Sequence, residues 1–134
     1  RTKVRAQKKK RLWVCDEARI MLKHKTSAEF LFWLIKRARK YWVGITTISQ
    51  DIEDFTRSEY GKPIISNSAL QILLKQSTTS IKLLNSLLWL SEVEQRRLVS
   101  CGIWEWLIFA WNQHVWVKIL ASAEEAAFIS TDVK

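Results

Sequence analysis

Glycine is scarce in this chain, and its scarcity excludes one common motif. The 134 residues include three glycines, at positions 44, 61 and 102, and a single proline. A phosphate-binding loop of the form G-x-x-x-x-G-K-[ST] needs paired glycines, and the sequence contains no such stretch. That loop cradles phosphates with its backbone N–H groups. The chain by itself therefore lacks the usual anchor for a nucleoside triphosphate.

Long apolar runs and clusters of metal-binding side chains are absent as well. No apolar run reaches the roughly 18 residues that predict a membrane span, and no signal-peptide pattern is present. Cys15 and Cys101 stand in apolar surroundings, which favours reduced core residues over a disulfide and suits a cytosolic compartment. His24 and His114 are isolated, so no Cys/His set has metal-ligand spacing.

Positive charge is abundant but concentrated at the start. The net charge is +9, and residues 1–11 hold seven of the 22 Lys and Arg residues and no acid. This basic lead-in segment could contact nucleic acid or acidic lipid; the alternative is a solvated segment that leads into the first strand. Because the chain opens in this run without an initiator methionine, we expect it to be part of a longer protein.

Two carboxylates follow a short apolar run near this start. Residues 12–15 (LWVC) suit a buried parallel strand, and Asp16 and Glu17 come directly after it. Ligands of open α/β sheets bind at the carboxyl ends of the strands. The layout is that of a Walker B element, in which the first acid holds Mg²⁺ through water and the second polarises the attacking water. The alternative is a strand that stops at a polar turn.

Two further strands also end in polar residues. Strands are predicted at 43–48 and 70–74, and they lead into Ser49-Gln50-Asp51 and Lys75-Gln76-Ser77. Residues 18–23, after the acids, suit a short loop or a helical turn, and 64–68 suit another helical turn. Helices are predicted from Thr26 or Ser27 to Tyr41 and at 51–60, 79–89 and 91–101, with a final helix at 122–129. Strands 103–110 and 114–120 predict a hairpin around Trp111-Asn112. The order predicts an α/β fold, a parallel sheet with flanking helices and an antiparallel edge hairpin.

Helix ends carry recognisable signals. Ser91 with Glu94 three residues later forms a capping-box pattern. Thr26 or Ser27 can cap the long second helix, and Gly102 fits the position just past a helix end.

With these elements in order, the chain resembles the ATPases of type IV secretion and conjugative DNA transfer (CagE/TrbE/VirB-type), RecA-like motors related to the HerA/FtsK translocases. The resemblance covers the chain from about Val4 to Lys134. It is carried by the following stretches: VCDEA (14–18), SAEFLFWLIKRARKY (27–41), VGITTISQDIEDFTRSEYGKPIISNSALQILLKQS (43–77), LSEVEQRRLVSCGIWEW (90–106) and LIFAWNQHV (107–115).

The resemblance implies roles for individual residues. It places Asp16, with Mg²⁺ bound through water, and Glu17 as the Walker B acids, and Gln50 as a sensor beside the γ-phosphate of ATP. Arg39 or Lys40 (Arg37 is a further candidate) would act on the nucleotide of a neighbouring subunit, where a cation stabilises the transferring phosphoryl group. Further matching positions in the later motifs are Asp51, Asn67, Lys75, Gln76, Gly102 and Glu105, of which Gln76 and Glu105 are expected at the nucleotide.

The resemblance also implies partners and a location. Relatives act as hexamers of sister subunits with other secretion components, in the cytoplasm at the bacterial inner membrane, and DNA could contact Arg1–Arg11. Since the phosphate-binding loop of the family lies upstream, residues 1–134 are predicted to be the C-terminal part of a RecA-like ATPase domain, inactive alone. The alternative is a non-catalytic interaction or nucleic-acid-binding module. A metal-dependent nuclease using Asp16, Glu17 and Asp51 lacks further ligands at useful spacing.

Tryptophan departs most from the family pattern. Eight tryptophans in 134 residues is an unusually large number. Trp42, Trp104, Trp106 and Trp111 stand where relatives typically carry glycine, and Trp33, Trp89 and Trp116 where relatives carry smaller or different residues. An indole cannot follow glycine into positive φ without strain. The indoles either reflect divergence of the sequence or offer stacking surfaces for bases.

Overall fold

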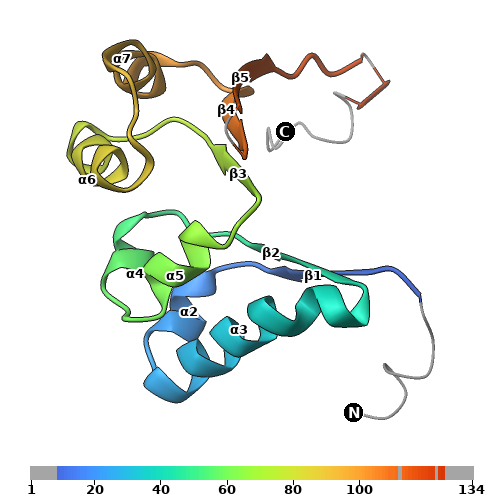
Figure 1. Cartoon of the computed structure of the whole chain (residues 1–134). Helices are drawn as coiled ribbons and strands as arrows, with labels where there is room; N and C mark the ends of the chain where they lie inside the picture. The colour runs from blue at the N-terminus through green and yellow to red at the C-terminus, as the bar shows by residue number, and fades with distance from the viewer. Residues whose placement is uncertain (1–8, 112, 123, 126–134) are drawn as a thin grey trace, which may run out of the picture.

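The computed structural model of the protein describes residues 9–111, 113–122 and 124–125. Figure 1 shows these residues as two groups of helices and strands, one above the other, which correspond to the first and second halves of the chain. The elements, in chain order, are β1 (Arg11–Cys15), α2 (Ala18–Leu22), α3 (Lys25–Ala38), a 3₁₀ turn η1 (Arg39–Tyr41), β2 (Val43–Thr47), α4 (Glu53–Thr56), α5 (Gly61–Ser66), β3 (Leu70–Leu73), α6 (Thr78–Leu88), α7 (Glu92–Ser100), β4 (Glu105–Ala110) and β5 (Gln113–Lys118).

The first half of the chain is a parallel strand pair covered by helices. Strand β1 pairs with β2 in register from Arg11 opposite Val43 to Cys15 opposite Thr47. The connection between them runs through α2 and α3, because parallel strands need a long crossover. A cluster of buried side chains from α2, α3 and α5 forms the core of this half: Leu22, Ala28, Leu31 and Ile64.

The second half is an antiparallel sheet with two helices (Figure 1). Strand β4 lies between β3 and β5 and is antiparallel to both. Its core draws on α6, α7 and β4: Ile81, Leu84, Leu90, Leu98, Leu107 and Phe109. Ile52, from the loop after β2, packs against this core together with Leu73 at the end of β3. The loop after β2 and the carboxyl end of β3 therefore border the same cluster.

The predicted α/β class and the edge hairpin are confirmed, with one difference in pairing. The sequence predicts β3 as a member of the parallel sheet, but among the described strands β3 pairs only with β4. One edge of β2 and one edge of β3 consequently have no strand partner in the described part of the chain. Alternation of apolar residues predicts that a strand exists, but it does not choose the neighbouring strand.

The prediction that residues 12–15 form a strand buried on both faces is wrong for this structure. Leu12 and Val14 are 71% and 51% exposed, and Cys15 alone is buried in β1. The apolar run remains consistent with a strand, but β1 has a single neighbour among the described strands. Its apolar side chains therefore have little to pack against.

Several helix ends differ from their sequence-based assignment. Helix α3 begins at Lys25, and His24 occupies its N-cap position without a side-chain hydrogen bond, so neither Thr26 nor Ser27 caps it. The predicted helix 51–60 is shorter, Glu53–Thr56, and helix α5 begins at Gly61 and contains Pro63, whereas the sequence predicts a helical turn only from residue 64. Proline is tolerated there because it lies in the first turn, where N–H groups have no partner within the helix.

Gly61 and Gly102 differ in whether the structure requires glycine at their position. A Cβ atom on Gly61 would stand 1.7 Å from the carbonyl oxygen of Phe55, so no side chain fits there. Gly102 follows α7 as predicted but does not adopt a positive φ. Cys101 ends that helix in an extended conformation instead. Glycine is therefore required at position 61 for close approach and is not required at 102 for its φ.

The remaining predictions concern the capping box, the cysteines and membrane crossing. The capping box of α7 is present, with Ser91 and Glu94 bonding to each other's backbone N–H group, and Cys15 and Cys101 are buried free thiols. Within the described residues, no helix is long and apolar enough to cross a membrane. The predicted final helix 122–129 lies mostly outside the described residues.

Candidate active site

The carboxyl ends of β1 and β2 bring together polar residues that are far apart in sequence. Parallel strands end at the same edge of a sheet, so the residues that follow β1 and β2 become neighbours. The Gln50 side-chain nitrogen Nε2 donates to Glu17 Oε1 at 2.9 Å, across 33 positions of sequence. Asp16 is exposed beside them, and its Oδ1 accepts from the backbone N–H of Glu17 at 2.9 Å.

Glu17 occupies an unusual backbone conformation. It lies directly before α2 with φ 53° and ψ 50°, the left-handed region. Non-glycine residues adopt this region rarely, and such strain occurs preferentially at functional sites. The conformation turns the chain sharply at the strand end. It leaves the Glu17 carboxylate partly exposed at the sheet edge, with 31% of the side chain accessible.

Arg19 is a part of this site that sequence reasoning missed. Its Nε lies 2.5 Å from Glu17 Oε2, so Arg19 and Gln50 each occupy one oxygen of the same carboxylate. A carboxylate has about four acceptor positions, so Glu17 can still accept a hydrogen bond from water. The only sequence signal for Arg19 was a basic residue two positions after the acid, which is common.

Two acidic residues in and after the loop that follows β2 form local hydrogen bonds. The Ser49 hydroxyl contacts Asp54 Oδ2, and Asp51 Oδ1 accepts from the backbone N–H of Glu53 at 3.1 Å. Asp51 thus acts as a local brace at the start of α4 rather than as a third acid beside Asp16 and Glu17. Within the described ranges, no group of three or more His, Cys, Asp or Glu side chains could hold a metal ion. This geometry offers no support for the nuclease alternative.

Arg39 and Lys40 lie at the opposite end of β2. They form the 3₁₀ turn that precedes this strand, whereas Gln50 follows it. A strand of five residues is about 16 Å long, so the structure does not bring these cations to Glu17 within one chain. Arg37 is also remote, with its guanidinium stacked over the Trp33 ring at 5.2 Å.

Gln76 and Glu105 bond to nearby residues rather than to Glu17 or Gln50. The backbone N–H of Gln76 donates to the Leu98 carbonyl, and its side-chain amide donates to the carbonyl of Leu74. Glu105 Oε2 accepts from the backbone N–H of Gly102 at 3.1 Å, and Lys118 lies 3.5 Å from Oε1. The backbone hydrogen bond from Gly102, with a smaller effect of Lys118, lowers the pKa of Glu105.

The other two positions from the later motifs are accounted for as well. The Asn67 side chain donates to the Pro63 carbonyl at the end of α5, and Lys75 is exposed. Within the described residues, no hydrogen bond or ion pair joins Asn67, Lys75, Gln76 or Glu105 to Glu17 or Gln50.

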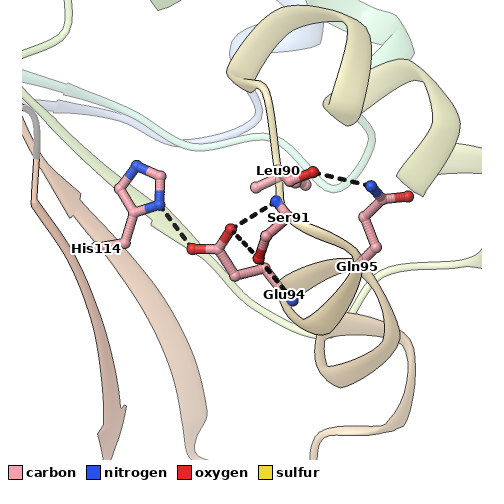
Figure 2. A network of polar contacts seen from close by, with 5 residues as sticks. All are labelled: Leu90, Ser91, Glu94, Gln95 and His114. Carbon is pink, nitrogen blue, oxygen red and sulfur yellow. Dashed lines mark hydrogen bonds and ion pairs between the residues drawn. The ribbon is translucent and has the colours of Figure 1, made fainter.

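A second polar network lies away from this site, between α7 and the hairpin (Figure 2). Glu94 Oε2 accepts from the backbone N–H and the hydroxyl of Ser91, both at 2.8 Å, and Glu94 Oε1 lies 2.6 Å from His114 Nδ1. Burial raises the pKa of Glu94, but the hydrogen bonds from Ser91 and His114 outweigh it and the net shift is downward. The Ser91 hydroxyl bonds to the acid rather than to the imidazole, so this is not the order of a Ser-His-acid nucleophile.

Comparison with known proteins places the chain in a family. The sequence profile of the TraG P-loop domain matches residues 2–120, most of the chain. The chain belongs to the TraG P-loop domain family. It is thus a member of the type IV secretion and conjugative transfer ATPases, as its sequence motifs indicate. P-loop domains bind nucleotides, generally as a magnesium complex of ATP.

Solved structures agree with this assignment. Twelve chains match this TraG-type chain in fold. One of them, VirB4 of Thermoanaerobacter pseudethanolicus, superimposes with a TM-score of 0.80 and 31% sequence identity over 90% of this chain. The chain spans about a third of that protein, since the match covers 34% of VirB4. A search of curated protein sequences finds no match.

Proposed function

We propose that this chain is the part of a type IV secretion or conjugation ATPase that carries the Walker B acids Asp16 and Glu17 and the sensor Gln50. The observation that supports the proposal most directly is the 2.9 Å hydrogen bond between Gln50 and Glu17 at the carboxyl ends of two adjacent parallel strands. Ligands of parallel α/β sheets bind at this edge. Two acids and an amide there are among the side chains that P-loop NTPases use to hold magnesium and to position the attacking water.

The proposed roles follow from the chemistry of each group. Glu17 is the general base, because its carboxylate is partly open to water at the edge of the sheet where the nucleotide would bind. Gln50 positions Glu17 through one N–H of its amide, and its carbonyl and second N–H remain able to bind water or a phosphate oxygen. A change at the phosphate would thereby be transmitted to the base.

Asp16 is the residue that would hold magnesium. Magnesium is usually bound by one or two carboxylates together with water and substrate phosphates, and a single exposed aspartate at a strand end fits this donor set. Bound magnesium would neutralise charge on the phosphates. Gln76 and Glu105 are proposed to approach the nucleotide, and Arg39 or Lys40 to act on the nucleotide of a neighbouring subunit in a homo-hexamer. The position of these two cations at the far end of β2 is compatible with action between subunits.

The phosphate-binding loop must come from outside these 134 residues, because the sequence does not contain it. We propose that residues 1–134 form the C-terminal part of a RecA-like ATPase domain in a longer protein. The exposed apolar side chains of β1 and the unpaired edges of β2 and β3 are surfaces that further strands and helices of such a domain would cover. Location at the bacterial inner membrane with other secretion components belongs to the same proposal.

The substitution Glu17→Gln in the longer protein tests the proposed base. It keeps the shape of the side chain but removes the group that accepts the proton. We expect ATP hydrolysis to fall by a factor of about 10²–10⁴ while ATP binding persists. Glu59→Gln is the matched control, since Glu59 is exposed and interacts with Lys25, at 3.5 Å, and with Tyr60 rather than with the candidate site. Near-wild-type hydrolysis by the Glu17 variant would remove this residue from the mechanism.

A second candidate function rests on the basic lead-in segment, residues 1–11. Seven positive charges without an acid could bind DNA phosphates, as in a nucleic-acid-binding or other interaction module without catalysis. A titration of DNA binding against salt separates the two candidates. Phosphate contacts predict an affinity that falls steeply with salt and is lost on deletion of residues 1–11; binding that survives both contradicts a phosphate-binding segment.

A further inference from the structure

Left-handed backbone conformations in this protein fall on tryptophan. Five non-glycine residues have positive φ among the described residues: Glu17, Trp42, Trp89, Trp104 and Trp111. Only a few per cent of non-glycine residues adopt positive φ, and a bulky residue there is an outlier. Glu17 lies at the candidate active site, where strain is expected. The other four, called here the left-handed tryptophans, need a different explanation.

Two of them end helices. Trp42 follows the 3₁₀ turn η1 with φ 57° and ψ 35°, and Trp89 follows α6 with φ 54° and ψ 51°. Helices commonly end in one left-handed residue, which is usually glycine because a Cβ atom is unfavourable there. The fold therefore requires at both positions the conformation that glycine adopts most readily.

The other two lie in turns of the second half. Residue 111 is the first of the two positions between Ala110 and Gln113, which pair at the end of the β4–β5 hairpin. Two-residue hairpin loops demand positive φ at their first position, and Gly-Asn is one of their sequence signatures. Trp104, with φ 69°, lies in the loop between α7 and β4. These are again positions where the backbone favours glycine.

The backbone groups of the left-handed tryptophans form hydrogen bonds, whereas their side chains are exposed. The N–H of Trp42, Trp89 and Trp111 donates to Arg39, Asn85 and Ala69 carbonyls, and the carbonyls of Trp42 and Trp104 accept from Arg11 and Ile119, all at 2.9–3.2 Å. Their side chains remain exposed, at 53% for Trp42, 86% for Trp89, 45% for Trp104 and 84% for Trp111. Glycine would keep every one of these backbone hydrogen bonds.

Other tryptophans of the chain behave differently. The Trp33 ring packs against Phe32 at 5.5 Å and lies under the cationic groups of Lys36 and Arg37. Trp116 lies under the Arg97 guanidinium at 4.4 Å. Within the described ranges, the left-handed tryptophans make no ring contact or cation–π contact of this kind. The same four residues therefore combine a positive φ with an indole that makes no aromatic or cation–π contact among the described residues.

We propose that the protein in its own organism carries glycine at positions 42, 89, 104 and 111, inserted at UGA codons. UGA is a stop signal in the standard genetic code, and other codes assign it to tryptophan or to glycine. If a UGA codon that means glycine is translated as tryptophan, tryptophan appears at every such position of the sequence, regardless of the backbone conformation there. One cause then explains both the abundance of tryptophan and its occurrence at four positions suited to glycine.

The proposal changes how two surface features are interpreted. A hollow of about 240 Å³ between α6 and the hairpin is lined in part by Trp89 and Trp111. With glycine at both positions these walls disappear, so the hollow is not a ligand site. The exposed indoles likewise offer no platform for stacked bases. The loop that precedes Glu105 becomes richer in glycine, which permits closer approach by another chain segment.

Peptide mapping of the native protein tests the proposal without any requirement for refolding. Trypsin yields peptides 41–57, 83–96 and 98–118, which contain all four positions, and peptide 26–36, which contains Trp33 as the internal control. We expect fragment masses that correspond to glycine at the four positions and to tryptophan at 33, with UGA codons at the four and UGG at 33. Tryptophan masses or UGG codons at the four positions would overturn the proposal, as would glycine at 33.

Thermal denaturation of the chain provides the physical test. Replacement of each left-handed tryptophan by glycine relieves an unfavourable backbone conformation, and it removes little buried surface at positions 89 and 111, where the indole is most exposed. We expect the melting temperature to rise by about 2–5 °C per substitution. Trp33→Gly is the matched control and should lower the melting temperature, because it places glycine inside α3 and removes ring contacts. A fall in melting temperature for all four substitutions would contradict the assignment of these positions to glycine.

Discussion

The two halves of this protein contrast in how completely their sheets are enclosed. The parallel pair β1–β2 carries the acids and the amide of the candidate site, yet Leu12 and Val14 on β1 stand exposed. In the antiparallel half, the central strand β4 buries Leu107 and Phe109 against two helices. Parallel sheets are normally covered on both faces. The strand that leads into the proposed acids is therefore less enclosed in this structure than the central strand of the antiparallel half.

Truncation of the largest buried side chains should give the largest effect and tests whether the halves unfold separately. Leu31 and Leu98 are fully buried, one in each core. We expect Leu31→Ala and Leu98→Ala each to lower the free energy of unfolding by about 2–5 kcal/mol. Hydrogen exchange should show the loss of protection mainly in the half that carries the substitution. Equal loss in both halves after either change would mean one cooperative unit.

Removal of the Glu94 carboxylate should have an intermediate effect confined to the antiparallel half. Glu94 completes the capping box of α7 and contacts His114 on β5 (Figure 2). We expect Glu94→Ala to cost about 1 kcal/mol at pH 7. Urea denaturation measures this cost, with Glu92→Ala as the control, since Glu92 lies in the same first turn of α7 and pairs with Arg96 at the exposed surface.

The cost of Glu94→Ala should depend on pH. The pKa of Glu94 is lowered from 4.5 in the folded state, so the unfolded chain binds the proton more readily. The stabilisation by the carboxylate is therefore fully present above pH 4.5 and is lost as the pH falls through the folded pKa. Below that pH the variant and the wild type should converge in stability. A constant difference between pH 7 and pH 3 would contradict an ionised carboxylate in this network.

Exposed ion pairs should have the smallest effect and should not distinguish the halves. Arg57 contacts Glu53 at 2.7 Å in the parallel half, and Arg96 contacts Glu92 at 3.0 Å in the antiparallel half, both at helical i, i+4 spacing. We expect Arg57→Ala and Arg96→Ala each to change the free energy of unfolding by less than about 0.5 kcal/mol. A large effect in one half alone would show that its surface charges contribute more than this comparison assumes.

Sequence patterns predicted most helices and strands because their signals are local. Periodic apolar residues identified α3 and α6, and the Ser91–Glu94 spacing identified the start of α7. The same reasoning misplaced the start of α3 by assigning its cap to Thr26 or Ser27. Hydroxyl residues cap helices only when the chain turns at that position, and here the turn occurs at His24.

The candidate site was predicted in part. The acid pair and Gln50 were named from the ends of apolar runs, and the structure brings them together. Arg19 was missed because a basic residue shortly after an acid is common in sequence, and only the left-handed turn at Glu17 makes the contact meaningful. Gln76 and Glu105 were named with the site, but in this structure the Gln76 side chain bonds to Leu74, and Glu105 bonds to Gly102 and Lys118.

The sequence by itself determined the α/β class, the acids at a strand end, the capping box and the absence of a phosphate-binding loop, since each depends on residues close together in the chain. Only the tertiary structure decided that Gln50 reaches Glu17 across 33 positions, that β3 joins β4 instead of β2, and that four tryptophans adopt positive φ. Pairing between distant strands and the backbone conformation of a turn depend on how the whole chain packs. A local sequence pattern therefore predicts neither the pairing of distant strands nor the backbone conformation of a turn.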